Sequence, residues 1–332
     1  MLDAAIIGGG SWGTAFALHL GRRRLSTRLW IREEDIREAL IKTRQNGVFL
    51  PGFTLPPEVS FSADIRETAA SAGILFIAVP SRFCRPVFRE IEPVLKREQI
   101  VVSLTKGIEE GSLKRMTEVM EEVFPRPRLP HLAVLSGPSF AREVAEKHPT
   151  AVVIAATEAE SARTVQRFVS DICFRAYTSD DVAGVELAGA LKNVIAMACG
   201  ISDALRFGHN TRAALITRGI VEISRLASKL GAKKETFLGL AGIGDLVLTC
   251  TARQSRNYHV GFELGKGRSL REILEATPMV AEGVTTTVSA LDLARREHVE
   301  MPISTEVYRV LYESKNPRTS LGDLMLRTLK EE

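Results

Sequence analysis

Cysteine is scarce in this chain and is not arranged for a metal or disulfide framework. The four cysteines among the 332 residues are Cys84, Cys173, Cys199 and Cys250, which lie far apart, without a C-x-x-C pair or a histidine at ligand spacing. This excludes structural zinc from the interpretation and predicts a cytoplasmic protein with reduced thiols and no metal. No uncharged apolar run approaches the roughly 20 residues of a membrane span, and a strand-like segment begins almost at Met1, so we expect no secretory signal and no stable membrane insertion.

An excess of one charge sign is also missing. The 44 basic and 40 acidic residues leave a formal charge of +4, with both signs interspersed. This balance is too weak to predict a nucleic-acid partner. Hydrophobic residues make up 45% and charged residues 25%, which is close to the average of globular proteins and excludes wholesale disorder. The length predicts two domains.

The first half of the chain alternates apolar, strand-like runs with helical patterns. Residues 74–79 form an uncharged run stopped by Pro80, which is typical of a buried parallel strand. Similar runs occur at residues 4–7, 27–31, 100–104, 132–135 and 151–155. The alternation predicts βαβ units and a doubly wound, Rossmann-like parallel sheet over residues 1–180.

The strand signal disappears after about Thr178, and residues 181–332 are predicted to form an all-α domain. Asn210 is the predicted N-cap of a helix over residues 211–230. Ser269 with Glu272 predicts a capping box at the start of another helix.

A glycine-rich turn follows the first predicted strand. Gly8, Gly10 and Gly13 form a G-x-G-x-x-G pattern between a strand and a helix, with a second strand about twenty residues later. The three glycines fit a tight turn, close backbone approach to a pyrophosphate, and close helix–sheet packing. The helix N-terminus adds free N–H groups and a positive dipole. The pattern therefore predicts dinucleotide binding, against the plainer interpretation of a simple turn.

The residue after the second predicted strand points to the choice of dinucleotide. An NAD-selective site usually has Asp or Glu there, whereas this chain has Arg32. A cation at this position suits the 2′-phosphate of NADP, so the sequence favours NADP, with NAD as an alternative. The other interpretation is that Arg32 is only a solvated surface charge before Glu33.

Nine motifs, in order along nearly the whole chain, resemble the bacterial type of NAD(P)-dependent glycerol-3-phosphate dehydrogenases. They are Gly8–Ala15, Asn46 with Leu50-Pro51-Gly52, Val79-Pro80-Ser81, Thr105-Lys106-Gly107, Ser136–Ala141, Glu186–Asn193, Gly242–Asp245, Ser255-Arg256-Asn257 and Val280–Gly283. The resemblance implies an N-terminal dinucleotide domain and a helical domain similar to that of 6-phosphogluconate dehydrogenases. It also implies reversible reduction of dihydroxyacetone phosphate to sn-glycerol 3-phosphate for glycerophospholipid synthesis, and a homodimer. Phe49 stands where the family often has Tyr.

Lys192 is the candidate proton donor. On a helix it shares one face with Val185, Ala188 and Ala196, so a stripe of small apolar residues surrounds the ammonium group and favours its desolvation. A lysine that covers apolar surface with its stem fits the same pattern. The family resemblance implies that Lys192 donates and accepts the proton.

Two further charged residues are catalytic candidates. Lys106 follows the predicted strand over residues 100–104, at the end where open α/β sheets bind ligands. The resemblance places Lys106 beside both substrate and nicotinamide. Asp245 lies in an otherwise apolar stretch, where a carboxylate needs a partner. Pairing with Lys192 or capping the helix that follows satisfies this need.

Ser255, Arg256 and Asn257 start a helix and suggest a phosphate site. Ser255 is a good N-cap, so Arg256 lies in the first turn, where a cation opposes the helix dipole unless an anion is also present. A substrate phosphate removes that conflict; an exposed surface arginine is the alternative.

The resemblance gives further roles to several residues. It places Gly137, Ser139, Lys192, Asp245, Ser255, Arg256 and Asn257 at the substrate, and Ser11, Trp12, Arg32, Ala141, Arg256, Val280 and Glu282 at the cofactor.

Two rival functions share this predicted architecture. One is a related reductase acting on another keto acid, which would lack the Ser255–Asn257 cluster. The other is a non-catalytic dinucleotide sensor, which would leave the joint presence of Lys106, Lys192 and Asp245 unexplained.

Overall fold

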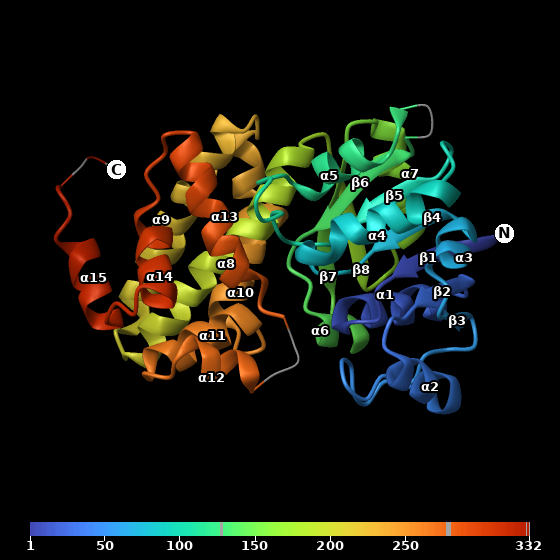
Figure 1. Cartoon of the computed structure of the whole chain (residues 1–332), viewed down its shortest axis with the longest axis horizontal. Helices are drawn as coiled ribbons and strands as arrows, with labels where there is room; N and C mark the ends of the chain where they lie inside the picture. Colours follow the sequence, from blue (N-terminus) through green and yellow to red (C-terminus); the bar gives the residue numbers. More distant parts are fainter. Residues whose placement is uncertain (127–128, 277–279, 330, 332) are drawn as a thin grey trace. The chain divides into compact units, whose positions relative to one another are not determined.

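The computed structural model describes residues 1–126, 129–276, 280–329 and 331. Its contacts divide the chain into two compact units (Figure 1). The first consists of residues 1–106 and 114–185, and the second of residues 107–113 and 186–332. The predicted domain boundary after residue 180 stays a prediction. The division into compact units falls after residue 185, and it places the short segment 107–113 in the second unit.

The first unit is built on one eight-stranded sheet of order β3-β2-β1-β4-β5-β6-β7-β8. The strands are β1 (Leu2–Ile7), β2 (Thr27–Trp30), β3 (Val59–Ser62), β4 (Ala72–Ile77), β5 (Ile100–Ser103), β6 (His131–Ser136), β7 (Thr150–Ala156) and β8 (Phe174–Ser179). The helices are α1 (Ser11–Arg22), α2 (Glu34–Thr43), α3 (Ile65–Ala70), α4 (Cys84–Ile91), α5 (Met116–Val123), α6 (Ala141–Ala145) and α7 (Ala159–Val169). The predicted α/β, Rossmann-like class is confirmed.

Two strands and one strand direction differ from the prediction. β3 and β8 were not predicted, because their short sequences alternate with polar residues and resemble loops. β7 runs antiparallel to β6, whereas the other neighbouring strands pair in parallel. The connection over residues 137–149 holds only the five-residue α6, which is too short for the helical crossover that usually joins parallel strands.

Helices cover both faces of this sheet, so its central strands are apolar on both sides. In β1, Ala4 and Ile6 belong to one buried cluster, which contains Phe16 of α1. Ala5 and Ile7 belong to a second cluster. Successive side chains of a strand point to opposite faces, so a continuous apolar run is what two buried faces require.

The second unit is helical and is centred on α8 (Val182–Ala204). The other helices are α9 (Gly208–Lys229), α10 (Asp245–Thr251), α11 (Arg256–Gly265), α12 (Leu270–Glu275), α13 (Glu282–Arg296), α14 (Pro302–Tyr312) and α15 (Pro317–Met325). By length and composition, α8 is the one helix among the described residues that could span a membrane, and 89% of its most apolar window is buried inside the protein. A buried core helix passes the same test.

Two of the three predicted helix starts in this unit are confirmed. Ser255 accepts a hydrogen bond from the N–H of Tyr258, and Ser269 and Glu272 form the capping box. The prediction for Asn210 is wrong: α9 begins at Gly208, so Asn210 lies inside the helix. Phe207 takes the N-cap position without a side-chain hydrogen bond, and Gly208, the first residue of the helix, adopts a φ of +86°.

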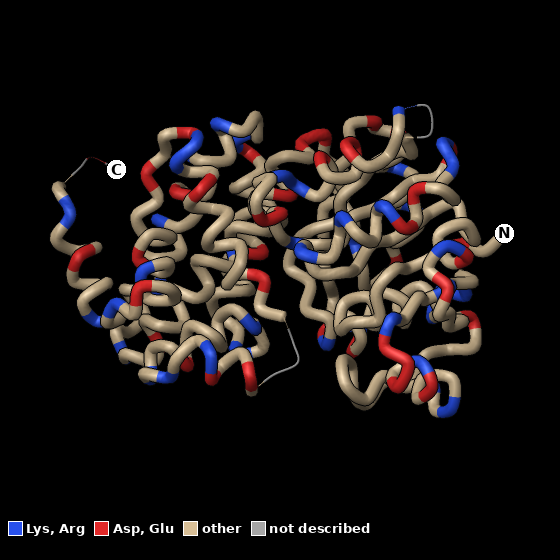
Figure 2. Tube along the Cα trace, in the orientation of Figure 1, with Lys and Arg blue, Asp and Glu red and all other residues tan. Residues whose placement is uncertain are grey.

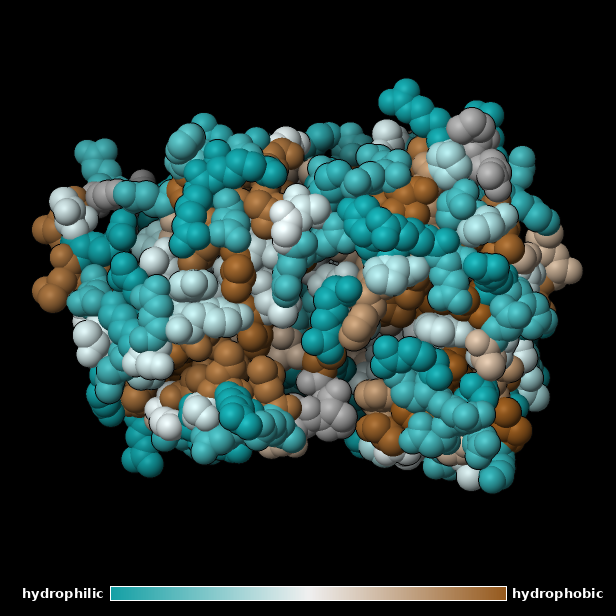
Figure 3. All heavy atoms as spheres, in the orientation of Figure 1, coloured by the Kyte–Doolittle hydropathy of each residue, from teal (hydrophilic) through white to brown (hydrophobic). Residues whose placement is uncertain are grey.

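Basic and acidic residues are interspersed along both units (Figure 2). Figure 3 shows hydrophilic side chains over most of one face, with apolar patches between them. The end of the chain carries three of the most exposed apolar side chains, Met325, Leu326 and Leu329.

Two buried acidic residues connect α14 to its neighbouring helices. Glu222 of α9 is 3% exposed and accepts hydrogen bonds from the backbone N–H groups of Ile303 and Ser304, both at 2.9 Å, and from the Ser304 hydroxyl at 2.7 Å. Burial raises the pKa of this carboxyl, and the three donors oppose the shift. Glu222 thus caps α14 from another helix.

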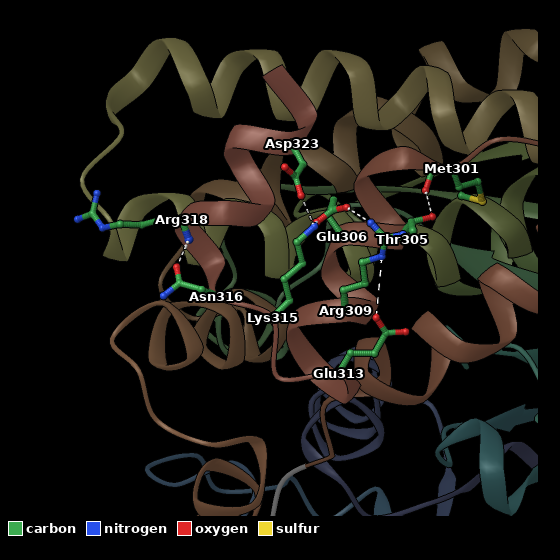
Figure 4. A network of polar contacts seen from close by, with 9 residues as sticks. All are labelled: Met301, Thr305, Glu306, Arg309, Glu313, Lys315, Asn316, Arg318 and Asp323. Carbon is green, nitrogen blue, oxygen red and sulfur yellow. Dashed lines mark hydrogen bonds and ion pairs between the residues drawn. The ribbon is translucent and has the colours of Figure 1, made fainter. Parts of the chain in front are cut away.

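Glu306, on the same helix, connects α14 to α15 (Figure 4). Its carboxylate binds the ammonium group of Lys315 at 2.5 Å, and Lys315 also binds Asp323 of α15 at 2.6 Å. Asn316 caps α15 through the N–H of Arg318.

We predict that Glu222→Leu lowers the free energy of unfolding by about 2–4 kcal/mol, because buried donors left without an acceptor cost about 1–3 kcal/mol each. Far-ultraviolet circular dichroism in urea would follow the helices, while fluorescence of Trp12 and Trp30 reports the first unit. Asp292→Ala, which removes an exposed ion pair with Arg295, is the control and should have little effect. Equal stabilities of the Glu222→Leu and Asp292→Ala variants would contradict the capping role.

Candidate functional site

The glycine turn has the geometry that the spacing predicts. Gly8 adopts a φ of +119°, and a Cβ there would lie 2.5 Å from the carbonyl oxygen of Ala78. A Cβ on Gly13 would lie 1.9 Å from the carbonyl oxygen of Gly8, whereas one on Gly10 would meet nothing within 4 Å. The first and third glycines are thus required by close packing, and the second leaves open space beside the backbone.

The N-terminus of α1 begins at this open position. Gly10 is its N-cap and provides no side-chain hydrogen bond, and the first turn contains no acidic residue. Backbone N–H groups and the helix dipole at such a terminus suit an anion. Ser11 is buried, and Trp12 is half-buried with its ring 5.7 Å from that of Phe16. These residues fit a dinucleotide pyrophosphate.

Arg32 is exposed at the end of β2. Its Nε and Nη2 donate to the same oxygen of Glu33, at 3.1 and 2.7 Å. Its guanidinium carbon also lies 5.4 Å from the ring centre of Phe83, and that of Arg82 lies 4.6 Å from the same ring. Two arginines therefore lie against one aromatic ring and form a cationic surface. The sequence predicted a role for Arg32 but not for Arg82.

Lys106, Gly137 and Ser139 form a polar cluster in the first unit. The ammonium group of Lys106 donates to the Gly137 carbonyl at 3.0 Å, and the Ser139 hydroxyl donates to the same oxygen at 2.9 Å. Lys106 follows β5 and Gly137 follows β6, so both lie beyond the carboxyl ends of neighbouring parallel strands, as predicted. Ala141 starts α6 and packs against the core of the same unit.

Lys192 and Asp245 form a buried ion pair in the second unit. The Lys192 Nζ lies 3.0 Å from Asp245 Oδ1, and the two side chains are 7% and 2% exposed. Their predicted pairing is confirmed, while Gly244 takes the N-cap position and Asp245 lies in the first turn of α10. Because the two opposite charges are buried together, their attraction offsets the desolvation cost of each.

Thr249 completes this cluster and was missed by the sequence interpretation. Its hydroxyl accepts a hydrogen bond from Lys192 Nζ at 2.5 Å and donates to the backbone carbonyl of Asp245 at 2.6 Å. The spacing of four residues from Asp245 places it on the same helix face, which was the available signal. Beside it, burial raises the pKa of Cys250 well above its usual value and keeps that thiol protonated.

The start of α11 brings together the predicted phosphate and cofactor residues of the second unit. Arg256 Nη1 donates to the carbonyl of Val280 at 3.3 Å. Although part of the Arg256 side chain is exposed, desolvation of its guanidinium by the surrounding protein lowers its pKa. The negative charge of Glu282 opposes this shift. Asn257 is buried, and its Oδ1 accepts from the N–H of Gly283 at 2.9 Å, so it joins α11 to α13.

A second contact joins α11 to α8. The Tyr258 hydroxyl donates to Asp203 at 2.7 Å, and Asp203 also pairs with Arg212 at 2.6 Å. Burial, aided by Asp203, raises the pKa of Tyr258 to about 12. This cluster was not predicted, because its members lie far apart in the sequence.

The described structure therefore contains predicted site residues in both units. The glycine turn, Arg32, Lys106, Gly137, Ser139 and Ala141 lie in the first, and Lys192, Asp245, Ser255, Arg256, Asn257, Val280 and Glu282 in the second. Among the described residues, no group of three His, Cys, Asp or Glu side chains is arranged to hold a metal ion.

Known proteins resemble the chain over its full length. Family models of the N-terminus and the C-terminus of NAD-dependent glycerol-3-phosphate dehydrogenase match residues 3–162 and 181–322. A protein of Syntrophotalea carbinolica named glycerol-3-phosphate dehydrogenase (NAD(P)+) is 49% identical over 331 residues, which is 100% of this chain and 99% of that protein. Its namesake from Geobacter sulfurreducens is 50% identical over 98% of both chains. The crystal structure of glycerol-3-phosphate dehydrogenase from Coxiella burnetii superposes with a TM-score of 0.93 at 38% identity, covering 98% of this chain and 99% of that one.

Proposed function

Because the chain belongs to the family of NAD-dependent glycerol-3-phosphate dehydrogenases, we propose that it reversibly reduces dihydroxyacetone phosphate to sn-glycerol 3-phosphate, with NADPH preferred and NADH as an alternative. Family membership confirms the predicted family, fold class and class of enzyme, an oxidoreductase that uses NAD(P). The product supplies glycerophospholipid synthesis. The observation that carries the proposal is the buried ion pair of Lys192 with Asp245.

The phosphate groups of the cofactor are held by residues of the first unit. The open backbone at Gly10 and the N-terminus of α1 fit the pyrophosphate, and Arg32 accounts for the preference for a 2′-phosphate. The bound nicotinamide supplies the hydride. We assign Ser11, Trp12 and Ala141 of this unit, and Val280, Glu282 and Arg256 of the second, to cofactor contacts.

Lys192 supplies the proton that the reduced carbonyl oxygen needs. Its ammonium group is held in one position by two acceptors, Asp245 Oδ1 at 3.0 Å and Thr249 Oγ1 at 2.5 Å. Asp245 stabilises the charged form, and the surrounding small residues of α8 exclude water. In the reverse direction, the same nitrogen accepts the proton. Lys106 polarises the carbonyl as a second cation.

Arg256 binds the substrate phosphate. It lies in the first turn of α11, whose N-terminus favours an anion, and a guanidinium adds charge-assisted hydrogen bonds. Ser255 and Asn257 shape this turn: Ser255 caps it, and Asn257 fixes it to the start of α13. Gly137 and Ser139 contribute to substrate binding from the first unit.

Both rival functions fit these observations less well. A keto-acid reductase has no need of an arginine in the first turn of α11, and a dinucleotide sensor has no need of a buried Lys–Asp pair, which costs desolvation energy. A homodimer and a cytoplasmic location are further parts of the proposal; the family resemblance supports both.

We predict opposite effects of two neighbouring substitutions on cofactor preference. Arg32→Asp should raise KM for NADPH about 10–100-fold more than KM for NADH, the factor that corresponds to 1.5–3 kcal/mol for a charged hydrogen bond. Glu33→Gln should lower KM for NADPH selectively, because Glu33 occupies the guanidinium of Arg32. Initial rates with each cofactor measure both effects, and equal changes for the two cofactors would remove Arg32 from the specificity determinants.

We predict that Arg256→Ala raises KM for dihydroxyacetone phosphate about 10–100-fold, since a charge-assisted contact to the phosphate is lost. Turnover should also fall to some extent, because phosphate binding positions the ketone. Because Arg256 is also assigned to the cofactor, both substrates are measured at saturating NADPH, and activity with unphosphorylated dihydroxyacetone should then hardly change. The matched control is Arg253→Ala, which removes an exposed arginine from the connection just before α11 and should change KM for neither substrate strongly. A proportional loss with both substrates would indicate a purely structural role for Arg256.

We predict that Lys192→Ala loses about 10²–10⁴-fold in turnover, the usual contribution of a general acid. NADPH binding, measured by fluorescence titration, should persist because the glycine turn is in the other unit. A small primary amine added to the solution should restore part of the activity. Since the substitution leaves Asp245 without its cation, the double variant Lys192→Ala/Asp245→Ala should be more stable than Lys192→Ala and equally inactive. Turnover within about threefold of wild type would exclude Lys192 as the proton donor.

A further inference from the structure

Asn46 is a completely buried amide in the connection between α2 and β3. Its Nδ2 donates to the carbonyl oxygen of Gly9 at 2.8 Å and to the hydroxyl of Thr14 at 2.9 Å. Its Oδ1 accepts from the backbone N–H of Phe49 at 3.0 Å. The Thr14 hydroxyl also donates to the Gly9 carbonyl, at 3.1 Å. Two side chains thus converge on one carbonyl group of the glycine turn.

The segment that carries Asn46 is closed at its base. Arg44 donates to the carbonyl groups of Leu55, at 2.7 Å, and of Pro56. The backbone of Gln45 forms an isolated antiparallel bridge with Thr54, and their side chains are joined at 3.0 Å. Because both ends of the segment are held together, Asn46 is presented to the glycine turn from a fixed loop and not from a loose one.

The Gly9 carbonyl matters because it belongs to the same peptide plane as the N–H of Gly10. In a trans peptide, the C=O and N–H bonds point in opposite directions. A carbonyl held toward Asn46 therefore turns the Gly10 N–H away from Asn46. Gly10 is the position of the turn where an added Cβ would meet nothing within 4 Å, so this N–H belongs to the backbone that is open to a ligand.

Glycine makes this control necessary. Peptide groups flanked by glycines rotate easily, since no Cβ restricts their φ and ψ angles. Gly9 and Gly10 are adjacent, so the sequence by itself leaves this peptide free to turn its carbonyl outward, where it would repel a phosphate. The hydrogen bonds from Asn46 and Thr14 fix the orientation in which an N–H, and not an oxygen, faces the ligand.

We propose that Asn46 is a positioning residue for the dinucleotide pyrophosphate, which it orders through the Gly9–Gly10 peptide without touching the ligand. The inference rests on the proposed function only in that the chain must bind a dinucleotide. Asn46 acts on the pyrophosphate part of the cofactor alone. Ligands that lack this part bind independently of Asn46.

The experiment compares two nucleotides by isothermal titration calorimetry on the full chain. ADP-ribose contains the pyrophosphate, and adenosine 2′-monophosphate does not. Asn46→Ala should weaken ADP-ribose binding about 10–100-fold, the effect of losing one well-directed hydrogen bond to a charged group. Its affinity for adenosine 2′-monophosphate should equal that of wild type. Gln45→Ala is the matched control. It removes the side-chain hydrogen bond to Thr54, but the contacts of Arg44 and the backbone bridge between residues 45 and 54 still close the segment, so neither affinity should change.

A second variant keeps the test decisive if Asn46→Ala does not fold. Thr14→Val removes the other side-chain donor to the Gly9 carbonyl and should weaken ADP-ribose binding in the same selective manner, by a smaller factor. Unchanged ADP-ribose affinity in a folded variant, or an equal loss for both nucleotides, would overturn the positioning role and leave Asn46 as a structural residue only. Failure of the wild-type chain to bind ADP-ribose would instead contradict the proposed function itself.

Discussion

The helical unit depends on placing two opposite charges inside an apolar helix bundle. Each charge alone would be strongly destabilising at 7% or 2% exposure, so Lys192 of α8 and Asp245 of α10 require each other and a fixed geometry. The Thr249 hydroxyl connects them by accepting from the lysine and donating to the Asp245 backbone. An ion pair of this kind contributes little to net stability, which makes a chemical role the better physical reason for its presence.

A second regularity is that three buried polar side chains, those of Glu222, Asn257 and Asn46, form hydrogen bonds with backbone groups at helix starts and in a turn. Glu222 accepts from the first turn of α14, and Asn257 accepts from the N–H of Gly283 at the start of α13. Asn46 donates to a carbonyl of the glycine turn. In each case a residue distant in sequence completes a terminus or a turn, because buried backbone groups without hydrogen bonds are costly. These three contacts between distant segments therefore lie at the starts of helices and at a turn.

These long-range contacts mark the boundary of what sequence patterns could predict. Six of the eight strands in the first unit, the close packing at Gly8 and Gly13, and the Ser255 cap follow from local rules, and the structure agrees with them. The need of Asp245 for a partner was predicted, with Lys192 as one of two possible solutions, and the structure contains that ion pair. The antiparallel β7, the partners of Asn46 and the role of Thr249 were not predicted. They depend on which segments meet in space, and neither periodicity nor spacing encodes that.

The start of α11 shows how the same physics bears on function. A guanidinium in the first turn of a helix opposes the dipole, and Arg256 is crowded enough for its pKa to be lowered. The carbonyl of Val280 and the charge of Glu282 offset part of this unfavourable position. Both compensating groups come from the same short segment, 280–282, which we assign to cofactor contacts. A bound phosphate would complete the compensation, so the substrate anion and the cofactor-binding segment would stabilise the same guanidinium. If Arg256 binds the substrate phosphate as proposed, its contact with the Val280 carbonyl would couple occupation of that site to the position of the segment 280–282.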